Sequence, residues 1–254
     1  MDIRSHNRDA WNRYVDGGES EWTKPVSPDV IARARKGDFS ILLTETKPVP
    51  QEWFPPLNGL DILCLASGGG QQGPVLAAAG ASVTVFDNSP RQLDQDRFVA
   101  EREGLDIRLV EGDMRDLSVF DDGSFDFIFH PVSNVFIHEI RPVWREAYRV
   151  LRKGGTLLAG FMNPIFYIFD VEKAWHGTME VCYKLPYADS DHPEIAEKLI
   201  AEGEALEHSH SLTEQLGGQM DAGFAIVGLY EDKMHTTAIS EYTPTYIATR
   251  AIKR

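Results

Sequence analysis

The chain has 254 residues, 43% of them hydrophobic, and a formal net charge of −14 at pH 7. This length suits one α/β domain with an added cap and can bury a full hydrophobic core without disulfides or metal ions. The acidic excess argues against a nucleic-acid partner, because affinity for a phosphate backbone depends on Lys and Arg, and it favours a small-molecule substrate.

The cysteines and the apolar stretches indicate where the protein resides. Cys64 and Cys182 belong to no Cys-x-x-Cys pair, so we interpret both as reduced thiols. Residues 1–7 carry no apolar signal region, and no apolar stretch approaches transmembrane length. We therefore expect a cytoplasmic protein without a membrane partner.

Residues 1–57 are predicted to form an N-terminal helical cap. Trp11 and Tyr14 lie at helical spacing, and Ser27 and Pro28 have the pattern of an N-cap and a first-turn proline. In such a cap Trp11 and Tyr14 are candidates for the lining of a substrate site. The other tryptophans of this segment, Trp22 and Trp53, are interpreted as packing residues.

Residues 58–162 alternate between apolar strands and amphipathic helices. The predicted strands cover residues 60–66, 82–87, 106–111, 125–130 and 156–161. One helix begins at Ser89 and runs to Gly104, and another ends at Gly154 and Gly155 after a cationic last turn. This alternation predicts a parallel sheet with right-handed crossovers.

A glycine loop follows the first of these strands. Gly68, Gly69 and Gly70 are consecutive, and Gly73 completes a Gly-x-Gly-x-x-Gly pattern. A strand, a tight glycine turn and a helix start let backbone approach a nucleoside-containing ligand. The pattern alone does not say which cofactor binds.

The rest of the chain divides into an insert, 163–210, and a C-terminal part, 211–254. The insert, which we expect to cover the active site, has strand character at 179–187. After the insert we predict a helix with one apolar face, which is formed by Leu212, Leu216 and Met220. The strands at 224–231 and 246–252 are joined too closely for a helical crossover, so we expect them to be antiparallel.

Residues 58–161, together with the end of the sheet, resemble the class I S-adenosylmethionine-dependent methyltransferases, in the small-molecule methyltransferase-domain branch. Four landmarks in chain order carry the resemblance: Ala66 to Gly70, Val85 to Asp87, Glu111 to Met114, and Val150 to Thr156. The resemblance implies a Rossmann-like, mostly parallel seven-stranded sheet with an antiparallel C-terminal strand and helices on both faces. It also implies S-adenosylmethionine as cofactor.

The resemblance assigns roles to particular residues. It implies that the glycine loop meets the methionine part of the cofactor, that Asp87 binds the ribose hydroxyls and that Asp113 meets the adenine amino group. The full set of candidate cofactor residues is Ala66, Ser67, Gly68, Gly69, Gly70, Asp87, Asn88, Gln92, Gly112, Asp113, Met114 and Pro131.

The expected chemistry is in-line displacement of a methyl group toward a small-molecule acceptor. His130, at the end of the fourth strand, is a candidate general base because its ordinary pKa lies near neutrality, but a histidine that is hydrogen-bonded near a strand end for structural reasons is the favoured alternative. Asn163 and Tyr167 are further candidates for substrate binding. His208 and His210 lack the Cys or carboxylate partners that would complete a metal site, so no metal is expected.

Two other functions share the glycine turn and the acidic residue. One is an NAD(P)-dependent oxidoreductase, and the other is a non-catalytic protein that binds cofactor on the same fold. The sequence leaves open the acceptor atom, which can be O, N, S or C, and the oligomeric state.

Overall fold

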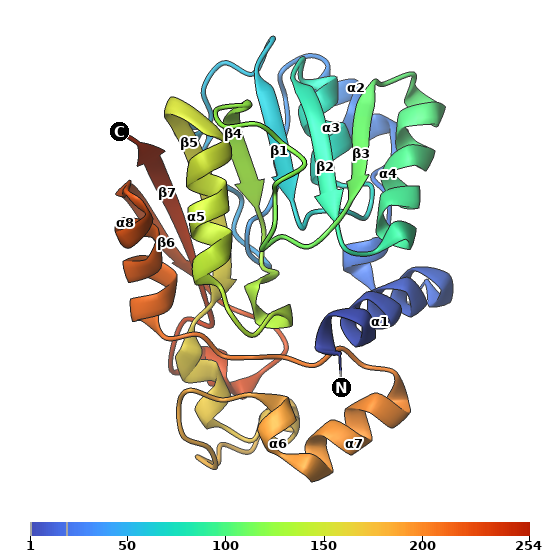
Figure 1. Cartoon of the computed structure of the whole chain (residues 1–254). Helices are drawn as coiled ribbons and strands as arrows, with labels where there is room; N and C mark the ends of the chain where they lie inside the picture. Colours follow the sequence, from blue (N-terminus) through green and yellow to red (C-terminus); the bar gives the residue numbers. More distant parts are fainter. Residues whose placement is uncertain (1, 19) are drawn as a thin grey trace.

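A computed structural model describes residues 2–18 and 20–254. Its centre is a seven-stranded sheet with helices on both faces and further helices along one edge (Figure 1). The strands, in the order in which they lie in the sheet, are β3 (Ile107–Glu111), β2 (Ser82–Asp87), β1 (Asp61–Leu65), β4 (Phe125–His130), β5 (Leu151–Met162), β7 (Tyr246–Lys253) and β6 (Phe224–Asp232). β7 is antiparallel to both β5 and β6, and the other neighbouring pairs are parallel. The predicted fold class is confirmed.

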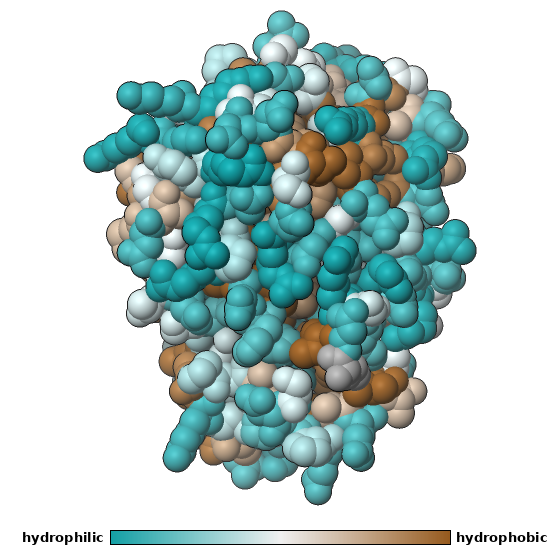
Figure 2. All heavy atoms as spheres, viewed as in Figure 1, coloured by the Kyte–Doolittle hydropathy of each residue, from teal (hydrophilic) through white to brown (hydrophobic). Residues whose placement is uncertain are grey.

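Eight α-helices accompany the sheet in the described part of the chain. They are α1 (Ile3–Gly17), α2 (Pro28–Ala34), α3 (Gln72–Ala78), α4 (Pro90–Glu103), α5 (Arg141–Val150), α6 (Val171–Trp175), α7 (Pro193–Glu202) and α8 (Gly218–Ala222). No helix of this part is both long and apolar enough to cross a membrane. The face of the molecule shown in Figure 2 is mainly hydrophilic, in keeping with the high proportion of charged residues.

The two faces of the sheet carry separate hydrophobic cores because successive residues of a strand point to opposite faces. Ile62 and Cys64 of β1 pack in the core that includes residues of α2, α3 and α4. Leu63 and Leu65 pack in the core on the other face, with α5. Helices α1, α6 and α7 lie beside the edge at which β1, β2 and β4 end (Figure 1). This edge is therefore where a ligand site can form.

The N-terminal segment divides into two parts that pack differently. Helix α1 lies at the edge of the sheet, as predicted for a cap. Ile31 and Ala34 of α2, by contrast, are fully buried in the core with α3. The backbone of Leu43 lies close against β5. A Cβ added at Gly160 of this strand would lie 2.2 Å from the carbonyl oxygen of Leu43. Helix α2 thus supports the core instead of covering the site.

The predicted boundary between α5 and β5 is wrong. Helix α5 ends at Val150, and residues 151–155, expected as a cationic helix end with a glycine cap, begin β5. Phe125 pairs with Leu151 and Phe127 pairs with Thr156, so the intervening residues form a bulge. Arg152 ion-pairs with Asp61 and Asp126 at the start of β1 and β4, which fixes this segment in the sheet.

Two further predictions near the insert are also wrong. The strand expected at 179–187 reduces to an isolated bridge between Phe169 and Val181, since Val181 is exposed and Pro186 has no N–H for a ladder. On the C-terminal helix Leu212 and Met220 face solvent.

The buried face of that helix is polar. Gln215 accepts a hydrogen bond from Asn134 (3.0 Å), and Gln219 accepts one from Thr249 (3.1 Å). Residues 213–217 are π-helical, which changes the spacing of side chains around the helix axis. These hydrogen bonds hold the helix on the sheet where the sequence pattern suggested apolar packing.

Candidate active site

A cavity of about 1620 Å³ lies at the carboxyl edge of the sheet and is lined by residues of α1, α6 and α7. The strand order reverses between β1 and β4, where the connections of the two strands leave in opposite directions. Open α/β sheets bind ligands at such a point. The cavity is large enough for a nucleoside cofactor together with a small acceptor.

Gly68 of the glycine loop lines one wall of the cavity and lies very close to the side chains of Gln92 and Asp87. A Cβ added at Gly68 would lie 2.6 Å from Cβ of Gln92 and 3.1 Å from Oδ2 of Asp87. A side chain at this position would therefore displace residues that line the cavity. Ala66, at φ 48°, turns the chain out of β1, and its N–H donates to the carbonyl of Phe86 (2.7 Å).

Asp87 ends β2 and faces the same wall. Its Oδ2 accepts from the N–H of Gly68 and its Oδ1 from the N–H of Ser89, each at 2.9 Å. Each carboxylate oxygen keeps a second lone pair, which a ribose hydroxyl can use. Burial raises the pKa of Asp87, and the backbone hydrogen bonds oppose that rise.

Gln92 and Asn88 line the cavity beside Asp87. Among the described residues nothing donates to Oε1 of Gln92, although this side chain is 5% exposed. A buried acceptor without a partner fits a ligand that brings a donor, such as a hydroxyl. Asn88 instead exchanges hydrogen bonds with Arg4 (2.9 and 3.2 Å), so it ties α1 to the sheet edge.

Asp113 follows the end of β3 and lines the cavity together with Gly112 and Met114. Both of its oxygens accept from the guanidinium of Arg115, at 2.6–3.1 Å. Although burial opposes it, Arg115 holds the pKa of Asp113 below its ordinary value. Arg115, which the sequence analysis missed, thus orients this carboxylate and keeps it ionised.

Two glycines of the predicted cofactor set lie behind the wall. Gly69 and Gly70 do not line the cavity, whereas Ala66, Ser67, Gly68 and Pro131 do. The N–H of Gly69 donates to Oδ2 of Asp96 (3.0 Å), and the carbonyl of Gly70 accepts from Val26 (2.9 Å). The fully buried Asp96, also missed from the sequence, therefore holds the loop from behind.

His130 is not placed to act as a base. It is fully buried and does not line the cavity. Nδ1 lies 2.9 Å from the carbonyl oxygen of Leu65, and Nε2 lies 2.9 Å from Oδ1 of Asn134. Burial lowers the pKa of His130 despite these contacts. Both ring nitrogens have partners in the protein, which supports the structural interpretation of His130 over the role of a general base.

Of the predicted substrate residues, Trp11, Tyr14 and Tyr167 line the cavity and Asn163 does not. The side chain of Asn163 accepts from the N–H of Ile165 (3.3 Å) and donates to the carbonyl of Pro244 (3.0 Å). It is thus a helix cap. Trp22, interpreted from the sequence as a packing residue, lines the cavity instead.

The cavity is also lined by polar residues of the insert, of β7 and of residues 42–45, among which the sequence analysis marked Tyr167 alone. Glu207 lies in the loop after α7, and its Oε2 accepts from the hydroxyl of Tyr167 (2.6 Å). Tyr187 donates to Asp189 (2.7 Å), and Tyr246 of β7 donates to Glu45 (3.0 Å). Apart from Tyr187 and Asp189, these residues come from separate segments of the chain, so neither spacing nor periodicity could have grouped them.

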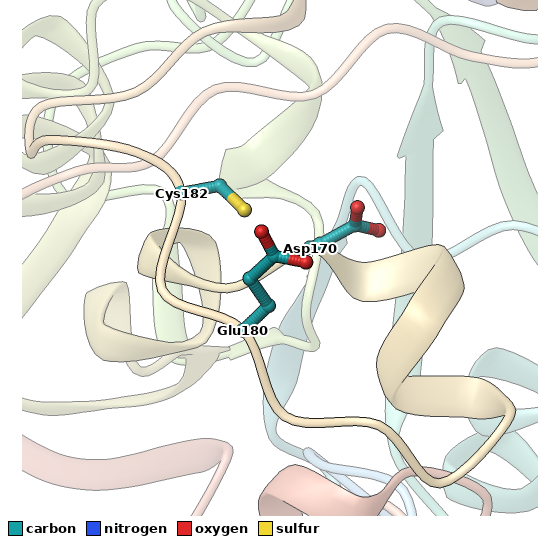
Figure 3. Close-up of side chains that lie close together, drawn as sticks. All are labelled: Asp170, Glu180 and Cys182. Carbon is teal, nitrogen blue, oxygen red and sulfur yellow. The ribbon is translucent and has the colours of Figure 1, made fainter.

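Asp170, Glu180 and Cys182 form the group in the described chain whose ligand atoms are close enough to share a metal ion (Figure 3). Glu180 and Cys182 are exposed. Lys173 already pairs with both Asp170 (3.3 Å) and Glu180. The two carboxylates therefore have a cationic partner within the protein.

Comparison with known proteins agrees with this site. The family model described as "Methyltransferase domain" matches residues 63–159. The chain is 54% identical over 251 residues, 98% of each chain, to the uncharacterized methyltransferase YbaJ of Bacillus subtilis (strain 168). It is also 35% identical to sterol 24-C-methyltransferase erg-4 of Neurospora crassa over 101 residues. This alignment covers 38% of this chain and 26% of that protein.

A similar fold occurs in an S-adenosylmethionine-dependent methyltransferase from Mesorhizobium loti. The TM-score is 0.62 at 18% identity, covering 80% of this chain and 94% of that one. The chain belongs to the class I S-adenosylmethionine-dependent methyltransferases. It is therefore an enzyme whose cofactor is S-adenosylmethionine, and a nicotinamide-dependent oxidoreductase is not favoured.

Proposed function

We propose that the cofactor binds between the glycine loop and Asp113 and that a small-molecule acceptor binds under the cap formed by α1 and the insert. In this arrangement Asp87 and Gln92 hold the ribose hydroxyls. Asp113 contacts the adenine amino group while it remains paired with Arg115. S-adenosylmethionine supplies an electrophilic methyl group, and its sulfur leaves as a neutral thioether that needs no acid.

One observation carries this proposal: a single cavity is lined by Gly68 and Asp87 at the sheet edge and by Trp11 and Tyr167 beneath the cap. Cofactor and acceptor can therefore meet without crossing the protein. Orientation of the reacting groups in such a site contributes roughly 7–11 kcal/mol to lowering the barrier. The chain then needs to supply a proton acceptor only when the acceptor starts protonated.

A small molecule is favoured over a nucleic acid because the chain carries 39 acidic and 25 basic residues. The sterol methyltransferase among the relatives is named for a small-molecule substrate, although that alignment covers 38% of this chain. We also propose a cytoplasmic location, supported by the two free cysteines.

The cofactor assignment is tested by Asp87→Asn. The change keeps the size of the side chain and removes its charge, which weakens two charge-assisted hydrogen bonds to ribose. We expect the dissociation constant of S-adenosylhomocysteine, measured by isothermal titration calorimetry, to rise about 10- to 100-fold.

Asp94→Asn is the matched control, because Asp94 lies on the same connection, in α4, but is only partly buried, pairs with Arg91 and Arg97, and does not line the cavity. It should bind as the unmodified protein does. Equal affinity of the Asp87 variant and the control would contradict the ribose assignment. A non-catalytic binding protein would bind the cofactor and yet transfer no methyl group to any acceptor in a substrate panel.

A further inference from the structure

The cavity is strongly acidic. Among the described residues, eleven Asp or Glu and three Arg or Lys side chains line it. Arg4 lies 3.7 Å from Asp113, Arg8 lies 3.0 Å from Asp9, and Lys198 lies 2.8 Å from Glu172. Each of these cations therefore has a carboxylate partner within the protein. An anionic acceptor would meet unpaired carboxylates, whereas a cationic one would be attracted.

Glu207 is the carboxylate best placed to meet an acceptor. Its Oε2 accepts from Tyr167 (2.6 Å), and no hydrogen bond from the described part of the chain reaches Oε1. Its backbone N–H donates to Oδ2 of Asp189 (2.7 Å), which fixes the loop. Because the side chain lines the cavity, Oε1 is available to a ligand.

The walls around Glu207 are aromatic. Tyr187 stacks on both Tyr167 (ring centroids 5.6 Å apart, interplanar angle 19°) and His192 (5.0 Å, 20°), which holds this ring group together. Tyr183 lies 5.0 Å from Tyr187 and is tilted by 54°, so it is not stacked on that ring. Phe166 and Tyr246 also line this part of the cavity. Aromatic faces attract cations through the ring quadrupole, most strongly where water is excluded. Rings beside a carboxylate therefore favour an ammonium group over a neutral alcohol or a carboxylate.

We propose that the acceptor is a primary or secondary amine, which binds as its ammonium ion against Glu207 and the surrounding tyrosines and gives its proton to Glu207. This inference rests on the proposed function, since it names the acceptor class for the same cavity. An ammonium ion has no lone pair, so an N–H bond must break before nitrogen can act as nucleophile. The proton passes to Oε1 of Glu207, and the freed electron pair on nitrogen forms the new bond to the methyl carbon as the carbon–sulfur bond breaks and its electron pair stays on sulfur.

The surroundings of Glu207 suit this exchange. Burial raises its pKa to about 7, Asp189 adds to the rise, and the hydrogen bond from Tyr167 opposes it. The hydroxyls of Tyr14, Tyr187 and Tyr246 also act on it, and all three have a raised pKa and are therefore neutral near pH 7. Above pH 7 Glu207 is thus the anion needed both to hold the cation and to accept the proton.

The test uses three probes of matched shape and different charge: phenethylammonium, 2-phenylethanol and phenylacetate. Each is titrated calorimetrically at pH 8 into protein saturated with S-adenosylhomocysteine. We expect phenethylammonium to bind at least about 10-fold more tightly than either other probe. Its affinity should fall as the pH is lowered from 8 to 6, because Glu207 becomes neutral.

Glu207→Gln keeps an acceptor for Tyr167 and removes the charge. This variant should lose about 10-fold in affinity for phenethylammonium and lose the pH dependence, with little change for 2-phenylethanol. The matched control is Glu197→Gln, since Glu197 is exposed on α7 and does not line the cavity. The control should retain the cation preference.

The inference is overturned if the alcohol or the acid binds the unmodified protein as tightly as the cation, or if the cation shows no measurable binding. If Glu207→Gln does not fold, the inference is judged from the unmodified protein alone, by its preference for the cationic probe and by the pH dependence of that binding. Failure to bind S-adenosylhomocysteine would count against the proposed function. Normal cofactor binding without a cation preference would remove the amine acceptor alone.

Discussion

His130 and Glu207 show how surroundings decide the role of a titratable side chain. His130 is fully buried, and both ring nitrogens have partners in the protein. Glu207 lines the cavity, and its only side-chain hydrogen bond in the described structure involves Oε2. Histidine has the more suitable ordinary pKa for a base, yet only the glutamate lines the cavity, which is why we assign the proposed proton transfer to Glu207.

His130→Ala tests the structural role of this histidine. The change removes the contacts of the ring with the carbonyl of Leu65 and with Oδ1 of Asn134, so we expect the free energy of unfolding to fall by about 1–3 kcal/mol. Urea unfolding measures this loss. The pH dependence of cofactor and probe binding should stay as in the unmodified protein, and a changed pH profile would return His130 to the binding chemistry.

At the scale of elements, Asp232 connects the end of β6 to residues 44–47. Its carboxylate accepts from the hydroxyl of Thr44 (2.7 Å) and from the N–H groups of Thr46 (2.8 Å) and Lys47 (2.9 Å). These contacts position Glu45, which lines the cavity and accepts from Tyr246. A buried carboxylate far along the chain thus shapes the acceptor end of the site.

Asp232→Asn should destabilise the protein in a pH-dependent way. Burial alone would raise its pKa, but the hydrogen bonds from Thr46, Thr44 and Lys47 lower it to about 2 from 3.8. A depressed pKa stabilises the fold above pH 3.8, and this contribution is lost as the pH falls toward 2. We expect a loss of about 2 kcal/mol at pH 7, measured by urea unfolding.

The difference between the Asp232 variant and the unmodified protein should narrow between pH 4 and pH 2. Asp38→Asn is the control, because Asp38 is exposed in the loop after α2. A gap that stays constant with pH would mean that the lost hydrogen bonds matter independently of charge.

At the scale of the whole molecule, the cap is held between the sheet edge and the insert. Asn7 of α1 donates to the carbonyls of Phe136 and Leu206 (3.0 and 2.9 Å). The hydroxyl of Tyr14 donates to Glu204 (2.5 Å) and accepts from the N–H of Ala205 (2.9 Å). Because α1 lines the cavity, these contacts control how readily a bound cofactor can leave.

Tyr14→Phe removes the hydroxyl and retains the ring. We expect S-adenosylhomocysteine to dissociate about 5- to 10-fold faster, since each lost hydrogen bond is worth about 1 kcal/mol. Stopped-flow tryptophan fluorescence measures the rate, because Trp11 and Trp22 line the cavity. Tyr242→Phe is the control, as Tyr242 is 74% exposed. Equal dissociation rates for the two variants would show that Tyr14 does not secure the cap.

Local patterns determined the sheet and the placement of the cofactor wall. Alternating or continuous apolar residues predict which side chains of a strand are buried. The carboxyl ends of parallel strands meet at one edge of the sheet, so Gly68, Asp87 and Asp113 were expected to lie close together. Helix and strand could not be separated at 151–155, because the ion pairs of Arg152 with Asp61 and Asp126 draw the segment into the sheet. Those partners are distant in the chain.

The tertiary structure decided the acceptor side and the roles of single polar residues. Glu207, Tyr167, Tyr246 and Glu45 lie in separate segments, and the packing of the insert against the sheet edge brings them into one cavity. No periodicity marks such a group, since each residue sits in its own loop or strand end. The regular helices and strands determine the fold and can be predicted from the sequence. The proposed acceptor chemistry depends on contacts between loops, which only the tertiary structure brings together.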